Sequence, residues 1–158
     1  MTPPAPTPVL PYRRSHFATQ LPLDYRYSAA HVWIARQDEQ TWRVGLTRFA
    51  TRMLGEIVDV GFDPPPGTPV QPGDVVGWIE GFKAISDLYC IATGRFAGAN
   101  PELKQDIELV TRDPYGRGWL YQVSGEPDPR CVDVYAYRDI LDQTIDRLLT
   151  KQQSDESA

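Results

Sequence analysis

The sequence predicts a mainly β fold, a flattened barrel or sandwich with flanking helices and a C-terminal helix. Short runs of alternating β-branched and aromatic residues, separated by turn residues, recur between His31 and Val123, which is the pattern of half-buried strands. A faint internal repeat indicates two related β halves, because the segment that starts at Gly55 resembles the segment that starts at Gly94. A long run of apolar residues at helical spacing follows Pro129, so a helix is expected at the end.

Residues 1–20 are expected to form a disordered tail. They contain five prolines and no periodic apolar pattern, so they cannot bury enough surface to offset the entropy lost on ordering. The folded domain is then expected over residues 21–128.

The first elements of this domain follow from local signals. Residues 31–36 and 41–45 alternate around a polar turn and predict a hairpin. Thr47 is a candidate N-cap for a short helix that ends at Gly55. A strand is expected at 56–62.

Later elements continue the β pattern. The Asp-Pro-Pro-Pro-Gly loop at 63–67 precedes a turn into a strand over residues 73–80. Residues 88–92 are expected to pair back, and residues 94–97 to continue after a turn. Asn100 followed by Pro101 predicts a short helix start. The internal repeat matches residues 103–110 to the segment 70–76, so it predicts a strand there. A turn at 113–116 leads into a strand at 119–123.

An amphipathic helix of about 15–18 residues is expected within residues 129–152, because apolar residues recur at helical spacing between Tyr137 and Leu149. We expect this helix to pack on the barrel. A helix that docks a partner protein is the alternative.

Composition narrows the class of protein. A chain of 158 residues with 41% hydrophobic content can form one domain with a core. A net charge of −5 argues against nucleic acid as a partner. No apolar stretch approaches the roughly 18 residues of a membrane span, and no secretory signal is visible. Two cysteines are too few for a disulfide scaffold, so we expect a cytoplasmic protein without a membrane partner.

The usual catalytic and metal-binding sets are absent from the sequence. It has two histidines, no zinc-ligand spacing and no phosphate-binding glycine-rich loop. We therefore expect no catalytic residues, no metal and no enzymatic activity of its own. Thirteen of the 16 basic residues are Arg, and the three lysines are Lys83, Lys104 and Lys151. A primary amine has chemistry that a guanidinium cannot replace.

Lys83 is the candidate site residue. It lies between the bulky Phe82 and the small Ala84 at the expected tip of a hairpin, with Glu80 and Asp87 on either side. An enzyme that acylates an amine needs an accessible lysine on a rigid turn. A solvated turn lysine is the alternative reading of these residues.

Around this lysine the chain resembles the H proteins of the glycine cleavage system, over about residues 25–125. The landmarks are Tyr27, His31-Val-Trp33, Val44-Gly-Leu-Thr47, Leu54-Gly-Glu-Ile-Val58, Glu80-Gly-Phe-Lys-Ala84, Ser86-Asp-Leu-Tyr89, Gly94, Asn100 and Asp113-Pro-Tyr-Gly116 with Trp119. The resemblance implies a hammerhead-like, lipoyl-type β-barrel sandwich that carries lipoic acid in amide linkage on Lys83. It implies recognition around the arm by Glu80, Gly81, Phe82, Ala84, Ser86 and Asp87.

Departures from the family pattern suggest a subgroup. Val32 replaces a usual acidic residue, Gly81-Phe82 replaces Ser-Val, and Cys90-Ile91 replaces Ala-Pro. This variant resembles the lipoate-binding proteins of the heterodisulfide-reductase-like sulfur-oxidation pathway. Its expected partners are a lipoate-attaching enzyme and that reductase-like complex, with Gly81 adding backbone freedom and Phe82 selecting among partners.

Three alternatives remain open. The chain could be the H protein that carries the aminomethyl group to the glycine cleavage enzymes, an unlipoylated binding module, or an accessory subunit with thiol chemistry at Cys90. We expect Cys90 to be buried among apolar neighbours and Cys131 to be exposed. His31 and Trp33 are interpreted as packing residues at the edge of the core, and Tyr115 as a candidate contact for the arm.

Overall fold

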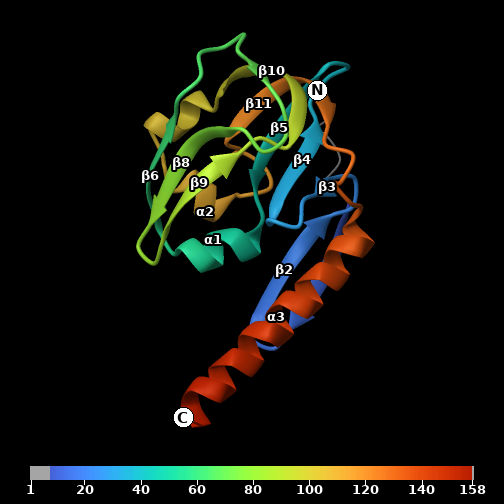
Figure 1. The fold of residues 1–158 in the computed structure, drawn as a ribbon, viewed down its shortest axis with the longest axis vertical. Coiled ribbons are helices and arrows are strands. Elements are labelled where there is room, and N and C mark those ends of the chain that lie inside the picture. The colour runs from blue at the N-terminus through green and yellow to red at the C-terminus, as the bar shows by residue number, and fades with distance from the viewer. Residues whose placement is uncertain (1–7, 158) are drawn as a thin grey trace, which may run out of the picture.

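Two antiparallel β-sheets form the body of the protein in the computed structural model, which describes residues 8–157 (Figure 1). The larger sheet runs in the order β3 (Arg26–Tyr27), β4 (Val32–Arg36), β5 (Thr41–Leu46), β11 (Tyr121–Pro127), β10 (Ala92–Ala99) and β7 (Pro69–Val70). The smaller sheet runs in the order β6 (Ile57–Phe62), β8 (Val75–Gly81) and β9 (Ile85–Tyr89). The predicted class, a mainly β sandwich with a C-terminal helix, is confirmed.

The main core lies between these two sheets. Ile34 and Val44 of the larger sheet and Ile79 of the smaller one are fully buried, as are Leu120 and Val123. Complete burial of such a side chain contributes about 1.5–3 kcal/mol. The two sheets are therefore held face to face by side chains that alternate along their strands.

A short helix, α1 (Arg48–Leu54), packs at one end of this body. The predicted cap is confirmed, because the Thr47 hydroxyl accepts a hydrogen bond from the Ala50 backbone N–H at 3.3 Å. Gly55 follows with a φ of +77°, a left-handed conformation that favours glycine. In Figure 1 the turn between β8 and β9 lies at the same end of the body as α1.

The expected disordered tail is wrong for residues 9–20. Strands β1 (Val9–Arg14) and β2 (Phe17–Pro22) form an antiparallel hairpin. Tyr12, Phe17 and Leu21 of this hairpin are buried. Residues 1–7 of the expected tail lie outside the described residues.

The hairpin is ordered because it packs against α3 (Val134–Ser157), which has 24 residues rather than the expected 15–18. The Tyr12 hydroxyl donates to the Asp142 carboxylate at 2.7 Å. The Arg14 guanidinium pairs with Asp146 at 2.8 Å and with Asp142 at 3.4 Å. Burial of Tyr12 together with its hydrogen bond to Asp142 raises the pKa of the phenol above its ordinary value.

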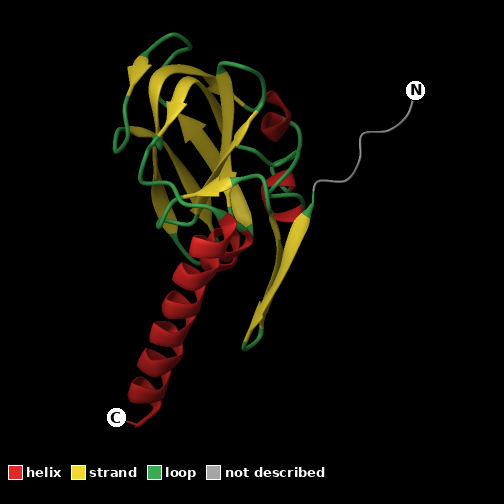
Figure 2. Cartoon of the chain, turned by 90° about the vertical axis from the view of Figure 1, so that its right-hand side faces the viewer, coloured by secondary structure: helices red, strands yellow, loops and turns green. Residues whose placement is uncertain are grey.

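The inner face of α3 continues the same apolar cluster. Val134, Tyr137 and Leu141 are buried, and the Tyr137 ring stacks on Tyr27 with centroids 4.6 Å apart. The outer part of the helix and the tip of the hairpin extend past the body (Figure 2). The expectation that the helix packs on the barrel therefore holds for its first turns, and the rest projects.

The internal repeat does not extend to a strand at 103–110. Asn100 caps a 3-10 helix, Pro101–Lys104, by accepting from the Glu102 N–H at 3.0 Å, and α2 (Leu109–Arg112) follows. The Asn100 amide also donates to the Trp119 carbonyl at 2.8 Å. A capping residue followed by proline therefore overrides the weak β pattern.

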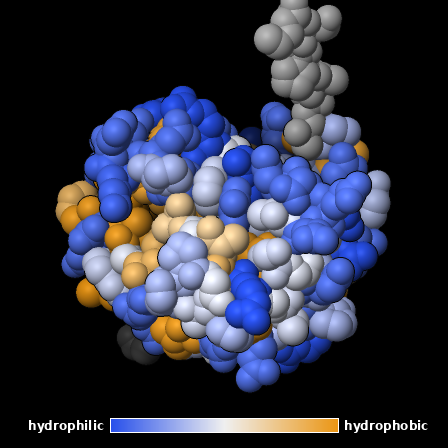
Figure 3. Space-filling model, turned by 90° about the horizontal axis from the view of Figure 1, so that it is seen from above, coloured by the Kyte–Doolittle hydropathy of each residue, from blue (hydrophilic) through white to orange (hydrophobic). Residues whose placement is uncertain are grey.

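Among the described residues, no helix is long and apolar enough to cross a membrane. The end of the molecule opposite the β8–β9 turn is largely hydrophilic, with smaller apolar areas between hydrophilic side chains (Figure 3).

Candidate functional site

Lys83 lies on the turn between β8 and β9, as the sequence predicts. The last paired residues are Glu80 and Ile85, and the Gly81 N–H donates to the Ala84 carbonyl at 2.9 Å. The side chain of Lys83 is exposed, and it forms no ion pair with any described residue. The amine is thus presented to solvent from a closed turn.

Backbone hydrogen bonds brace this turn against the end of α1. The Lys83 N–H donates to the Leu54 carbonyl at 2.9 Å, and the Phe82 N–H donates to the Glu56 carbonyl at 3.0 Å. A Cβ atom added at Gly55 would lie 3.0 Å from Lys83 Cγ, so the aliphatic stem of the lysine rests on this glycine. Reasoning from the sequence missed residues 54–56 as part of the site, although a helix-ending glycine was a visible signal.

Gly81 allows the close approach between the turn and the helix. A Cβ atom added there would lie 2.1 Å from the Leu54 carbonyl oxygen and 2.7 Å from the Leu54 carbonyl carbon. The expected role of Gly81, backbone freedom, is therefore corrected: this residue is buried and makes room for the neighbouring backbone, which holds the turn in one place.

The residues predicted to surround the arm do come together on this turn and its two strands. Phe82 is 76% exposed and Ile85 is 70% exposed, while Ala84, Ser86 and Asp87 are also exposed. The Glu80 side chain is half-buried. Lys83 is thus flanked by two large apolar side chains with carboxylates close by in the sequence on both strands.

An apolar pocket of about 260 Å³ opens between α1 and β9, beside the turn. Phe49, Met53 and Leu88 contribute apolar walls, and Val32 lines it where the family usually has an acidic residue. Asp87 is the one charged side chain among the described lining residues. The pocket therefore suits a mainly apolar group.

His31 also lines the pocket, and its protonation state follows from its neighbours. The Thr47 hydroxyl donates to the His31 carbonyl at 3.1 Å, and the Tyr137 hydroxyl donates to Thr47 Oγ1 at 3.0 Å. The hydroxyl proton of Tyr137 is thus already used in the hydrogen bond to Thr47. The Tyr137 oxygen lies 2.8 Å from His31 Nδ1, so Nδ1 must donate a proton to it. Burial lowers the pKa of His31 to about 4, and Nε2 therefore carries no proton at neutral pH.

Trp33 packs in the core, as expected. Its indole is nearly fully buried, and Nε1 donates to the Leu46 carbonyl at 3.1 Å and to the Pro114 carbonyl at 2.9 Å. The ring lies against Gly45, where an added Cβ atom would come within 2.5 Å of it.

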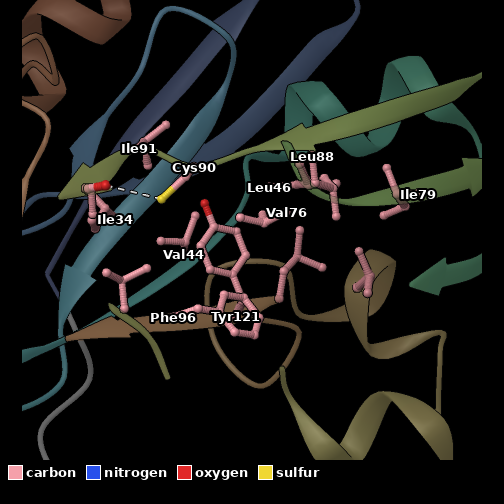
Figure 4. Packing of buried hydrophobic residues seen from close by; sticks show 14 of the residues in the cluster. Ile34, Val44, Leu46, Val76, Ile79, Leu88, Cys90, Ile91, Phe96 and Tyr121 are labelled. Atoms are coloured by element: carbon pink, nitrogen blue, oxygen red, sulfur yellow. Dashed lines mark hydrogen bonds between the residues drawn. The ribbon is translucent and has the colours of Figure 1, made fainter. Parts of the chain in front are cut away.

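Both cysteines are buried. Cys90 is confirmed as a core residue, and its thiol donates to the Ala92 carbonyl at 3.2 Å (Figure 4). The expectation that Cys131 is exposed is wrong. Val132 pairs with Tyr27 through two backbone hydrogen bonds of 2.8 Å and holds the preceding cysteine against the sheet. Burial raises the pKa of both thiols, and that of Cys131 reaches about 11, so thiolate chemistry is unfavourable at either position.

Tyr115 contacts the opposite end of α1 from Lys83. Its hydroxyl accepts from the Arg48 N–H at 3.0 Å, and its carbonyl accepts from the Tyr25 hydroxyl at 2.6 Å. It does not line the pocket between α1 and β9. The expected contact with the arm is thus replaced by a role in holding the start of the helix.

Two packed sheets, with an exposed lysine on a braced turn of the smaller one, define the class of this protein as a lipoyl-type β-sandwich. The chain belongs to the glycine cleavage H-protein family, whose model matches residues 25–141. The β1–β2 hairpin and the outer part of α3 lie outside this matched region.

Relatives named as glycine cleavage system H proteins resemble most of the chain. The protein of Corynebacterium jeikeium is 37% identical over 123 residues, which are 76% of this chain and 96% of the relative. That of Mycobacterium tuberculosis H37Rv is 37% identical over 128 residues, 81% of this chain and 92% of the relative. The crystal structure from Mycobacterium marinum matches with a TM-score of 0.66 at 34% identity, covering 74% of this chain and 95% of that one.

The expected link to sulfur oxidation finds no support in these comparisons. The relatives carry the name of the glycine cleavage system, so the alternative that the sequence left open agrees with them better.

Proposed function

We propose that this protein is a lipoyl carrier of the glycine cleavage system, with lipoic acid attached through an amide to Lys83. The observation that carries the proposal is the exposed lysine on a turn fixed by hydrogen bonds to Leu54 and Glu56. When bound, the lipoyl group would supply a cyclic disulfide whose S–S bond opens on reduction, and one of the two sulfurs could then hold an aminomethyl group.

The residues around Lys83 fit such an attachment. The Nζ amine reaches solvent without an ion pair to any described residue, so an acyl-transferring enzyme need not break one. Ala84 on one side leaves a small neighbour, and Gly55 supports the stem of the lysine. Formation of the amide removes the positive charge of Lys83.

The pocket between α1 and β9 would serve as a resting place for the carried group. Its apolar walls exclude water from whatever enters. Asp87 offers a carboxylate and His31 an unprotonated Nε2 among the lining residues, so a cationic or hydrogen-bonding group can be oriented at one side of the pocket.

Intact mass tests the attachment. The protein is produced with a lipoate-attaching enzyme, and the wild type should gain the mass of one lipoyl group. Lys83→Arg should gain none. Lys104→Arg, a change at another exposed lysine, should be modified like the wild type. A wild type that stays unmodified with several such enzymes would leave the unlipoylated binding module as the better description.

Glycine-dependent release of carbon dioxide tests the pathway. The lipoylated protein, mixed with glycine decarboxylase, should support the release in proportion to its concentration. Lys83→Arg should not support it. A lipoylated protein that fails here would still be a carrier, but for another system.

Sulfur oxidation remains the second candidate, because one observation favours it. Val32 lines the pocket where the family usually has an acidic residue, which weakens the case for a cationic cargo. Reduction of the lipoylated protein by a heterodisulfide-reductase-like complex, without activity with glycine decarboxylase, would favour this candidate.

A further inference from the structure

The net charge of the protein is concentrated in residues 56–91, which form β6, β8 and β9 of the lysine-bearing sheet, and also β7 and the loops between these strands. These residues contain six acidic side chains and a single basic one, Lys83. Three of the six, Asp59, Glu80 and Asp87, lie on the strands of the lysine-bearing sheet. The whole chain has 21 acidic and 16 basic residues, so the remaining segments contain fifteen of each. The rest of the protein is therefore neutral overall, and the net charge comes from the segment that contains the lysine-bearing sheet.

Two of these carboxylates face each other across strands. Asp59 of β6 pairs with Glu80 of β8 in the antiparallel register, which places both side chains on the outer face of the sheet. Neither forms an ion pair with a described residue. Like charges directly opposite each other destabilise a sheet, so this pair does not contribute to folding.

Large apolar side chains border the same acidic face. Ile85 pairs with Glu80 on the next strand, and it is 70% exposed. Phe82 on the turn is 76% exposed. An exposed aromatic residue and an exposed isoleucine on either side of a modified lysine form the kind of apolar patch that a partner buries.

We propose that Phe82 and Ile85, together with the facing carboxylates of Asp59 and Glu80, form a docking face for glycine decarboxylase. A partner that fits this face needs an apolar recess for Phe82 and a border of Arg or Lys side chains. The assignment of this partner rests on the proposed function. The glycine cleavage name of the relatives supports the choice of partner, and the unpaired carboxylates of this face would speed encounter with a cationic entrance.

Lipoylation makes the net charge of this docking face more negative. Lys83 is the only cation within residues 56–91, and the amide neutralises it. The strands of the modified sheet and the lysine turn then carry three carboxylates, Asp59, Glu80 and Asp87, and no positive charge. The lipoylated protein should therefore bind a cationic entrance more tightly than the unmodified protein, even where the arm itself makes no contact.

The test uses lipoylated variants and three measurements. These are the affinity for glycine decarboxylase, the KM for the lipoylated protein in glycine-dependent carbon dioxide release, and the melting temperature. Glu80→Lys should raise this KM about tenfold at low salt. Its melting temperature should be equal to or above that of the wild type, since the new lysine faces Asp59. Phe82→Ala should weaken binding about tenfold or more. Asp139→Lys makes the same charge change at an exposed position of α3. Its affinity and its KM should equal those of the wild type.

The outcomes separate this inference from the function on which it rests. If the lipoylated wild type is active and Glu80→Lys and Phe82→Ala bind and turn over like Asp139→Lys, the docking face is refuted and the carrier function stands. If Glu80→Lys loses stability as well as binding, Glu80 has a structural role and the inference also fails. A lipoylated wild type without activity with glycine decarboxylase refutes both.

Discussion

Substitution of Gly81 by alanine should detach the lysine turn from α1. The added Cβ atom would lie 2.1 Å from the Leu54 carbonyl oxygen, whereas ordinary contacts begin near 3.4 Å, so the turn and helix must separate by more than 1 Å. Such a shift breaks the 2.9 Å bond from the Lys83 N–H to Leu54 and strains the 3.0 Å bond from Phe82 to Glu56.

The expected cost follows from these contacts. Two backbone hydrogen bonds contribute about 1–3 kcal/mol together, and relief of an overpacked contact costs a further 1–3 kcal/mol or so. We expect Gly81→Ala to lower the free energy of unfolding by about 2–6 kcal/mol. For a domain of this size, that corresponds to a fall of about 5–25 °C in melting temperature.

Thermal unfolding and the rate of lipoylation should be measured on the same preparations. Gly81→Ala should also be lipoylated more slowly, because the amine is no longer held in one orientation. Phe82→Ala is the matched control: its side chain is 76% exposed, so its melting temperature should be close to that of the wild type. A Gly81→Ala protein with unchanged melting temperature and unchanged lipoylation would refute the reasoning.

Three further predictions concern other parts of the fold. Because the pKa of His31 is about 4 in the folded protein and 6.5 when exposed, the free energy of unfolding should fall by up to about 3 kcal/mol between pH 6.5 and pH 4. His31 has a φ of +68°, and asparagine tolerates this left-handed backbone. In denaturant titrations at each pH, His31→Asn should therefore remove most of this fall in the free energy of unfolding. Tyr12→Phe loses the hydrogen bond to Asp142 and should cost about 1 kcal/mol in the same titrations, without changing the lipoylated mass at Lys83. Cys90 and Cys131 should react with iodoacetamide at pH 8 at least about tenfold more slowly in the native protein than in denaturant, and rapid native labelling would contradict their burial.

Local signals account for much of the body and for the lysine turn. The cap at Thr47, the helix-ending Gly55 and the Asn100 cap all act within a few residues, so the sequence is enough to predict them. The exposed position of Lys83 follows from a two-strand pattern with a short turn between.

Contacts between distant segments account for the errors. The hairpin of residues 9–22 has its apolar positions at Tyr12, Phe17 and Leu21, but their partner is a helix more than a hundred residues later. Cys131 is covered because its neighbour Val132 pairs with Tyr27. The clash that makes Gly81 necessary depends on how closely α1 approaches the turn. No local pattern encodes any of these distances.

The packing of the β1–β2 hairpin against α3 has a consequence for biosynthesis. Tyr12 and Asp142 are 130 positions apart, and synthesis adds about 5–20 residues per second. The hairpin therefore leaves the ribosome several seconds before the helix that covers it. During this time the side chains of Tyr12, Phe17 and Leu21 are exposed to solvent. A chain interrupted before α3 keeps this two-stranded ribbon uncovered, and an uncovered ribbon edge invites pairing with other chains. The strands that carry Lys83 pair within residues 57–89, so an interrupted chain can present its lysine while still exposing a surface that chaperones recognise.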